Sequence, residues 1–326
     1  MPIYCKVTRG NHVESQHLIY AVAVNEVGEI IFSTGDPEYQ TCIRSSFKPF
    51  QAAASVHAGA VQSAGFTGEE LALMCGSHNG EVIHVKTAKS MLNKLGFSID
   101  HYECGIHAPY DKESKTELLH KKKDYSPFNN NCSGKHAGML ALAKHLGVKP
   151  AGYTNRDHLV QKTIFDLLRI YSGQNEIVTA IDGCSAPTPF MSLHSIALLF
   201  QKLASGQYAE LEEVYQAMAH HPYLVAGRNR FDTDFIKVMK GKAITKIGGE
   251  AVRGVSIRNK NGETFGLSLK VLDGNQRANP VATLALLDHL KFIEEEDLAE
   301  LKDYRNPKLF NHRKIQTGDI SVHIKS

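Results

Sequence analysis

The two ends of this chain carry the residue pattern of β-strands. Residues 17–36 contain two β-rich runs separated by residues 25–29, which predicts a hairpin with a glycine-containing turn. Residues 250–274 repeat this pattern, with residues 255–257 and 265–271 on either side of Asn261-Gly262, a strong hairpin signal. We therefore expect strands from the two ends to join in one antiparallel sheet.

The long middle of the chain has the apolar spacing of helices, with apolar residues three and four positions apart. This spacing recurs in residues 49–60, 68–77, 83–97, 134–147, 156–172, 192–205 and 211–221, and again in residues 280–293. The expected fold class is α+β, with a sheet lobe of residues 1–40 and 241–326. A mostly helical lobe of residues 41–240 is inserted, and the site is expected between the lobes. From about Asp303 onward we expect a loosely ordered tail.

Composition narrows the classes of partner. The formal net charge of the 326 residues is +3, and residues 121–123 are the only basic run, so we expect no nucleic-acid partner. The first 15 residues lack the apolar core of a signal peptide, and apolar runs such as residues 196–200 are too short to span a membrane. We therefore expect a cytoplasmic protein whose six cysteines are reduced and mostly buried.

A serine and a lysine one helical turn apart form the first chemical signal. Ser45 and Lys48 have the i, i+3 spacing that places them on the same face of a helix, whereas Ser46 points elsewhere. Pro49 is tolerated only in a first turn, which puts Ser45 at or beside the helix N-terminus. A lysine activates a hydroxyl if burial or nearby positive charge, for example from Arg44, favours its neutral amine.

This S-x-x-K alone is weak, because a helix cap and a surface lysine would also explain it. Two later stretches favour catalysis: Ser77-His78-Asn79 is an S-x-N, and Lys246-Ile247-Gly248 is a K-x-G on an expected strand. The three motifs in this order are those of serine β-lactamases and penicillin-binding proteins. In this chemistry an N–H from the K-x-G strand joins the Ser45 N–H in an oxyanion hole. The motif set therefore favours a covalent serine amidohydrolase.

Two further stretches each place a cysteine in a glycine-containing loop beside a helix. Cys132 and Lys135 are one turn apart, and Asp182 lies two residues before Cys184. Zinc sites usually show closer Cys or His pairing, and a lysine must lose its proton before it can ligate a metal. From spacing alone, two buried thiols are favoured over a metal site.

Taken together, these stretches resemble a known family. The segments that carry the likeness are residues 44–51, 75–81, 130–140, 181–189, 220–233 and 245–252. They are similar to the rhizobial-type (class 3) L-asparaginases. The resemblance implies hydrolysis of L-asparagine to L-aspartate and ammonia, a serine-β-lactamase-like fold and a homodimer.

The resemblance also implies roles for single residues. Two Ser–Lys pairs carry over, Ser45 with Lys48 and Ser77 with Lys246, although Lys270 is also on an expected strand and competes with Lys246. A zinc ion bound by Cys132, Lys135 and Cys184 is implied as well, with Asp182 beside these ligands. Such a zinc would orient the amino-acid substrate, since the serine pathway needs no metal-activated water.

The remaining candidates concern substrate binding. We expect a cation, Arg44 or the zinc, for the substrate carboxylate, and Asp182 or Glu81 for its ammonium group. The substrate-binding candidates are Arg44, Asn79, Glu81, Asn131, His136, Asp182 and Gly248. The bulky Phe47 is expected to narrow the pocket and to favour asparagine over glutamine. Residues 221–233 have the polar density of a binding or dimer loop.

Three alternatives stay open. A serine-type glutaminase shares the chemistry and differs by one methylene in its substrate, which a pocket distinguishes only modestly. A β-lactamase-type hydrolase shares the motifs, but such enzymes normally work outside the cytosol. A catalytically inactive amino-acid-binding relative would keep the fold and lose the chemistry.

Overall fold

The protein is described by a computed structural model that covers residues 3–324. The chain forms two compact units. The sheet unit comprises Met1–Ser46, Met191–Ser205 and Val238–Ser326, and the helical unit comprises Phe47–Phe190 and Gly206–Lys237. The expected lobes differ from these units mainly in residues 191–205, which we had placed in the helical lobe.

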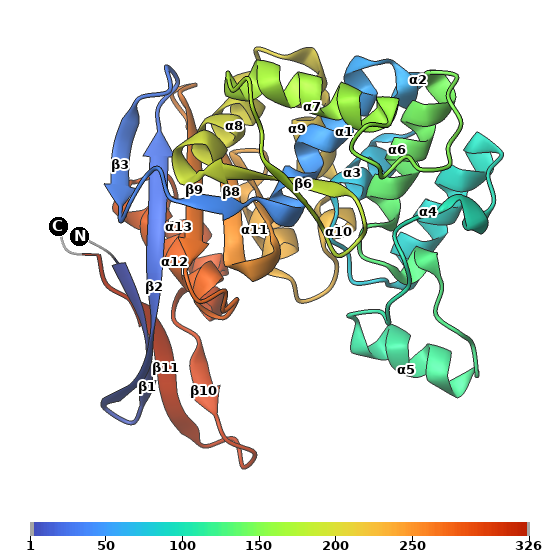
Figure 1. The fold of residues 1–326 in the computed structure, drawn as a ribbon. Coiled ribbons are helices and arrows are strands. Elements are labelled where there is room, and N and C mark those ends of the chain that lie inside the picture. The colour runs from blue at the N-terminus through green and yellow to red at the C-terminus, as the bar shows by residue number, and fades with distance from the viewer. Residues whose placement is uncertain (1–2, 325–326) are drawn as a thin grey trace. The chain divides into compact units, whose positions relative to one another are not determined.

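An antiparallel sheet forms the core of the sheet unit (Figure 1). Its strand order is β10-β11-β1-β2-β9-β8-β7, and β3 pairs with the remaining part of β2. The strands are β1 (Ile3–Arg9), β2 (His12–Val24), β3 (Ile30–Thr34), β7 (Ala243–Ile247), β8 (Val252–Arg258), β9 (Thr264–Val271), β10 (Lys308–Phe310) and β11 (Gln316–Val322). The unit also contains β4 (Gln40–Cys42) and helices α8 (Leu193–Ser205), α12 (Ala278–His289), α13 (Glu295–Glu300) and α14 (Lys302–Arg305). The predicted α+β class, with one antiparallel sheet built from both chain ends, is confirmed.

Both predicted hairpins are present in this sheet. Strands β2 and β3 are joined through residues 25–29, and β8 and β9 turn at Gly262, whose φ of +83° is in the left-handed region that glycine adopts readily. The prediction of a loose C-terminal tail is wrong. Strand β11 pairs with both β10 and β1, and it buries Ile320 against the sheet. Most other residues of β11 are polar or glycine, so the sequence lacks the alternation of apolar and polar residues by which a strand is predicted.

Helix α8 belongs to the sheet unit because small residues let it lie close to the sheet. A Cβ at Gly254 would collide with Phe200 of α8, and a Cβ at Gly266 would collide with the backbone of the same helix. Ser268 adds a hydrogen bond of 2.6 Å to the Leu193 carbonyl. The alternate residues of β9, such as Leu267, point to the other face of the sheet. The helix expected over residues 192–205 is present as α8, and it lies in the sheet unit, whereas we had placed these residues in the helical lobe.

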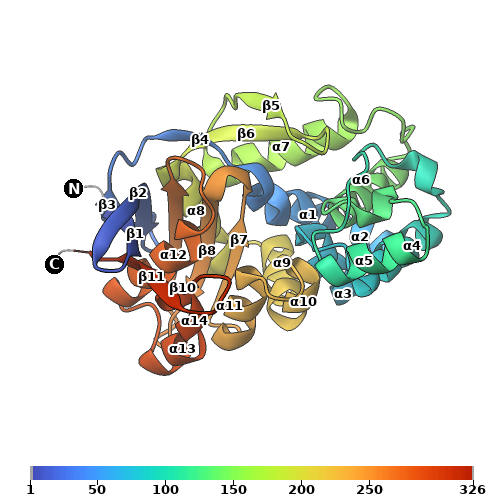
Figure 2. The ribbon, with the colours of Figure 1, turned by 90° about the horizontal axis from the view of Figure 1, so that it is seen from below.

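The helical unit consists of many helices and one small strand pair (Figure 2). The helices are α1 (Lys48–His57), α2 (Ala60–Ser63), α3 (Gly68–Cys75), α4 (Val82–Leu95), α5 (Lys112–His120), α6 (Ser133–His145), α7 (Leu159–Ser172), α9 (Ala209–His220), α10 (Pro222–Val225) and α11 (Phe231–Met239). The strands β5 (Thr179–Ile181) and β6 (Pro187–Ser192) pair antiparallel. The helix expected over residues 49–60 ends at His57, because Gly59 adopts a φ of +80°.

Close packing of α3 against α6 positions the chemistry of this unit. Gly134 lies against the Leu73 backbone and Gly138 lies against Met74, so neither position has room for a Cβ. Residues 133–143 of α6 are all buried. This contact brings the end of α3, where Ser77 follows, next to the beginning of α6, where Cys132 and Lys135 lie.

Candidate functional site

Lys48 is the first residue of α1 and its side chain is buried, with 1% exposed. Its Nζ lies 3.0 Å from Ser77 Oγ and 3.1 Å from the Asn131 carbonyl oxygen, and it also donates to the Gly76 carbonyl. Carbonyl oxygens only accept hydrogen bonds, so two N–H groups are committed to Gly76 and Asn131. The third position of the nitrogen faces Ser77 Oγ. A neutral amine in this place would accept the hydroxyl proton of Ser77.

The surroundings of Lys48 favour its neutral form. Burial lowers the pKa of the amine, and the nearby Lys135 ammonium lowers it further, whereas the Cys132 and Cys184 sulfurs act in the opposite direction. The net result is a lowered pKa. We had named Arg44 as a source of the positive charge that lowers the Lys48 pKa. In the structure, Lys135 supplies such a charge.

Ser45 and Ser46 lie in a 3-10 turn, Arg44–Phe47, that runs directly into α1. Ser46 is fully buried and donates a hydrogen bond of 2.8 Å to the Lys246 carbonyl on β7. Ser45 is half-buried. Pro49 occupies the first turn of α1, as predicted. The two neighbouring hydroxyls therefore differ in role, because Ser46 fastens the turn to the sheet.

The K-x-G stretch lies at the end of β7 and continues into a strained turn. A Cβ at Gly248 would lie 2.6 Å from the Ile43 carbonyl oxygen, and one at Gly249 would lie 2.9 Å from the Arg44 guanidinium carbon. Arg44, Glu250 and Ala251 all have positive φ, between 52° and 57°, which is unusual for residues with a side chain. The Gly248 N–H donates to the Val252 carbonyl, so this amide is not the oxyanion donor that we expected from the strand.

The two lysines that the sequence offered for the second Ser–Lys pair, Lys246 and Lys270, both lie in the sheet unit. Lys246 on β7 is fully buried and donates to the Ile247 carbonyl at 2.8 Å. Lys270 on β9 donates to the Val271 carbonyl at 2.6 Å and to the Glu250 carbonyl. Burial lowers the pKa of Lys270. Lys270 thus holds the strained turn at Glu250 in place, whereas Lys246 is the lysine of the K-x-G motif on β7.

Cys132, Lys135 and Cys184 come together in the helical unit. Lys135 Nζ lies 2.8 Å from Cys184 Sγ. The Cys132 thiol hydrogen-bonds to Cys184 and holds the Cys184 pKa far below its usual range; burial opposes this, and Lys135 and His136 lower the pKa further. Burial disfavours the charged form of Lys135, but Cys184, Cys132 and Asp182 together outweigh it and raise the lysine pKa. These shifts favour a thiolate on Cys184 and an ammonium on Lys135.

The chemistry of these donors is suited to the zinc that the resemblance implies, on one condition. Zinc bound tetrahedrally by sulfur and nitrogen would hold two such ligands roughly 3.6 Å apart. The observed 2.8 Å is a direct ion-pair distance, so a metal would widen the cluster and release the Lys135 proton. Within residues 3–324, no three His, Cys, Asp or Glu side chains are arranged to hold a metal. The implied set fits only if Lys135 ligates as a neutral amine.

The expected substrate-binding residues of the helical unit are already engaged in different ways. His136 Nδ1 lies 2.7 Å from the Tyr153 hydroxyl, and its ring approaches Cys184. The main-chain carbonyl of Asn131 accepts a hydrogen bond from Lys48. Asp182 lies close enough to Lys135 to favour the lysine's charged form, as expected for a carboxylate beside the cluster. Asn79 and Glu81 bind residues 223–230.

Phe47 does not line a pocket. Its side chain is 1% exposed, and its ring packs against Phe50 and Phe165 at centroid distances of 6.5 and 5.8 Å. The position between Ser46 and Lys48 points into the core of the helical unit. The expectation that Phe47 narrows the pocket is therefore wrong.

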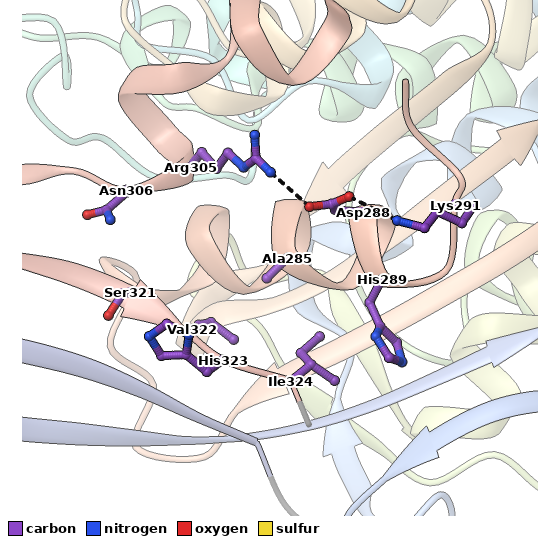
Figure 3. A pocket seen from close by; sticks show the side chains of 10 residues that line it. All are labelled: Ala285, Asp288, His289, Lys291, Arg305, Asn306, Ser321, Val322, His323 and Ile324. Carbon is purple, nitrogen blue, oxygen red and sulfur yellow. Dashed lines mark hydrogen bonds and ion pairs between the residues drawn. The ribbon is translucent and has the colours of Figure 1, made fainter. Parts of the chain in front are cut away.

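A separate cavity of about 390 Å³ lies in the sheet unit, beside α12, α14 and β11 (Figure 3). Its charged side chains pair with one another: Asp288 lies 2.9 Å from Arg305 and 3.5 Å from Lys291. None of the sequence-predicted site residues lines this cavity.

Some parts of the site have no signal in the sequence. The Gly76 and Asn131 carbonyls that fix Lys48 are backbone atoms, which a motif does not reveal. The contact between Lys48 and Ser77 was also missed, because we had paired Ser77 with Lys246. Residues 221–233 were noticed for their polar density, but their partners were not.

Comparison with known proteins places this chain among the amidohydrolases. The model of the family described as L-asparaginase II matches residues 5–322. The chain belongs to the L-asparaginase II family. The comparison with curated proteins gave no significant match.

Solved structures with some similarity include Mglu and a β-lactamase from Sphaerobacter thermophilus. One Mglu chain is 12% identical, with 84% of this chain and 67% of that chain covered and a TM-score of 0.44. Another, crystallised in 4.3 M NaCl, has 12% identity, 84% and 61% coverage, and a TM-score of 0.37. The β-lactamase is 13% identical, with 85% of this chain and 92% of that chain covered and a TM-score of 0.44. The chain thus spans about two thirds or less of the two Mglu chains.

Proposed function

We propose that this protein hydrolyses L-asparagine to L-aspartate and ammonia through a covalent β-aspartyl ester on Ser45. The observation that carries the proposal is the buried Lys48 amine, held by two carbonyls and turned toward the Ser77 hydroxyl. Ser45 is three residues before Lys48 on consecutive helical turns. Membership of the L-asparaginase II family supports the substrate class.

The proposed acylation step uses these groups. Lys48, as a neutral amine whose free position turns from Ser77 to Ser45, takes the proton of Ser45, whose oxygen attacks the side-chain amide carbon of asparagine. Backbone N–H groups stabilise the tetrahedral oxyanion, with the Ser45 N–H as one donor. The proton then passes from Lys48 through Ser77 to the leaving nitrogen, and ammonia departs. The 3.0 Å contact between Lys48 and Ser77 supports this relay.

The second half of the reaction runs through the same groups. Water attacks the ester carbonyl while its proton passes through Ser77 to Lys48, and Lys48 returns a proton to the Ser45 oxygen as the ester breaks. The products are aspartate and the original enzyme. Lys246, on the sheet unit, is the proposed second lysine, and Lys270 is the alternative.

Substrate recognition and the metal are further parts of the proposal. We assign the substrate carboxylate to Arg44, which lies over Gly249, and the substrate ammonium to Asp182. Cys132, Lys135 and Cys184 are the proposed zinc ligands. When bound, zinc would act as a Lewis acid that orients the amino-acid end of the substrate. We also propose a homodimer and a cytoplasmic location. As a separate finding, no helix in residues 3–324 has the length and apolarity to cross a bilayer.

One assay separates the proposed function from its rivals. Ammonia release is measured from L-asparagine and L-glutamine, and ring opening from a chromogenic β-lactam, each with and without a chelator. The proposal predicts release from asparagine at a kcat/KM at least tenfold above that for glutamine, and no β-lactam turnover. Faster glutamine turnover would favour the glutaminase, and binding of asparagine without turnover would favour the inactive relative.

A further inference from the structure

Residues 77–81, between α3 and α4, are held along one side by residues 223–230. The Ser77 N–H donates to the Val225 carbonyl at 2.8 Å, and the Asn79 N–H donates to the Ala226 carbonyl at 2.9 Å. These two backbone bonds lie two residues apart, as in an extended chain. We call residues 223–230 the clamp segment. Both segments belong to the helical unit.

The Asn79 side chain adds two bonds of opposite polarity to the clamp segment. Arg230 Nη1 donates to Asn79 Oδ1 at 2.8 Å, and Asn79 Nδ2 donates to the Arg228 carbonyl at 2.9 Å. The amide therefore has one orientation, because its oxygen meets a donor and its nitrogen meets an acceptor. A charged donor such as Arg230 makes the stronger of the two bonds.

Glu81 is the third fastening point, again two residues further on. The carboxylate is 5% exposed and accepts a hydrogen bond of 2.9 Å from the Arg228 N–H and one of 2.6 Å from the Tyr223 hydroxyl. Gly227 makes the approach possible, because any Cβ there would collide with Glu81 and its φ is +106°. A buried carboxylate needs such donors, so Glu81 and the clamp segment stabilise each other.

His78 and Gly80, which alternate with these three residues, make their hydrogen bonds away from the clamp segment. The Gly80 N–H donates to His78 Nδ1 at 3.1 Å, so the proton of the neutral ring is on Nε2. Nε2 then donates to Ser133 Oγ at 2.9 Å, at the first residue of α6. Residues 77–81 are thus held on two sides. Ser77, Asn79 and Glu81 bind the clamp segment, and His78 binds the first residue of α6.

We propose that the clamp segment is a positioning element for Ser77, with Arg230 and Glu81 as its positioning residues. It rests on the proposed function, because it acts through the Ser77 hydroxyl that faces Lys48. Residues 76–80 lie outside the helices α3 and α4, so Ser77 is not part of a helix that would fix it. A displacement of about 1 Å in a relay group costs on the order of 100-fold in rate. Residues 221–233, which include the clamp segment, thereby gain a structural role in holding Ser77. The side chains of Asn79 and Glu81, which we had assigned to substrate binding, hydrogen-bond to the clamp segment instead.

The neighbouring cavity does not offer a competing role for these residues. It has a volume of about 360 Å³, and its lining includes Glu81, Glu113, Tyr223 and Arg228. Arg228 pairs with Glu113, and Glu81 is occupied by Tyr223 and the Arg228 backbone. The other acidic residue of the lining, Glu117, pairs with Lys121, so the charged side chains of the cavity already have protein partners.

The test compares Arg230→Ala and Arg230→Lys with wild type and with Arg169→Gln, an exposed arginine of α7 that pairs with Asp166. The measurements are kcat and KM for L-asparagine, the melting temperature, and hydrogen exchange of the peptide that contains residues 76–81. We expect Arg230→Ala to lower kcat by about 10- to 100-fold with KM changed less than threefold. The exchange of residues 77 and 79 should rise, Arg230→Lys should recover part of kcat, and Arg169→Gln should match wild type.

A second variant covers the case in which Arg230→Ala does not fold. Tyr223→Phe removes only the hydroxyl that binds Glu81, and we expect a smaller loss of kcat, about three- to tenfold, with faster exchange at residues 77–81. Unchanged exchange and unchanged kcat in the folded variants would overturn the clamp. If wild type shows no asparagine turnover, the proposed function fails, whereas the exchange measurement still decides whether the clamp exists.

Discussion

Lys48 Nζ lies 3.0 Å from Ser77 Oγ, and it also donates to the main-chain carbonyls of Gly76 and Asn131. This relationship sets the role of both residues. The Gly76 and Asn131 carbonyls take two N–H groups, and the Ser77 hydroxyl is a partner with which Lys48 can exchange a proton. In the proposed mechanism, Lys48 passes protons between the Ser45 and Ser77 hydroxyls.

The first prediction separates the two neighbouring serines of the 3-10 turn. Ser45→Ala should lower kcat for L-asparagine by roughly 10³-fold or more, because it removes the nucleophile. Ser46→Ala removes the bond to the Lys246 carbonyl and should cost about 1 kcal/mol in the free energy of unfolding, with a much smaller loss of kcat. Steady-state kinetics and denaturant titration check both. The assignment fails if Ser46→Ala is the more damaging change to kcat.

The second prediction concerns the proton carried by Lys48. Lys48→Met keeps a long apolar stem and removes the base, so kcat should fall by about 10²- to 10⁴-fold. Lys48→Arg keeps a positive charge that does not dissociate at working pH, and it should be equally inactive. Kinetics with L-asparagine measure both variants. Substantial activity in Lys48→Arg would show that a fixed charge, and not proton transfer, is what the site needs.

The third prediction concerns the cysteine–lysine cluster. Cys184→Ala leaves the Lys135 ammonium buried without its thiolate, which should cost about 3–5 kcal/mol in the free energy of unfolding. Adding Lys135→Met should restore much of this loss. Neither variant should retain zinc in native mass spectrometry, whereas wild type and the control Cys42→Ser should. Zinc retained by Cys184→Ala would remove this cysteine from the ligand set.

The fourth prediction follows from the corrected place of Phe47. Because its ring is buried against Phe50 and Phe165, Phe47→Ala should lower the free energy of unfolding by about 3–5 kcal/mol. Phe47→Leu should fold and leave the ratio of asparagine to glutamine turnover within twofold of wild type. A marked change in that ratio would restore Phe47 to the substrate pocket.

Much of the fold was predictable because its signals are local. The hairpin at Gly262 follows from the turn residues, and helices such as α4 and α7 follow from apolar spacing. Strands β10 and β11 were missed, since they are short or polar; β11 pairs with β1, and β10 pairs with β11. The partner of α8 was also missed, because it depends on glycines and serines of distant strands.

The site was predictable in its residue types and less so in its contacts. The motifs gave Ser45, Lys48 and Ser77 by order and spacing. The partners of Lys48 include two backbone carbonyls, and its positive neighbour is Lys135, which is far away in the sequence. A motif indicates which side chains can do the chemistry, whereas tertiary packing decides which residues each of them contacts.

The most direct test asks which serine oxygen carries the acyl group. Wild-type enzyme is mixed with L-asparagine, quenched in acid within milliseconds, digested and analysed by mass spectrometry, with Lys48→Met treated alongside. An aspartyl ester on the peptide that contains Ser45, absent from Lys48→Met, is the predicted result. An ester on the peptide that contains Ser77 instead would contradict the proposal and make the serine nearest Lys48 the nucleophile.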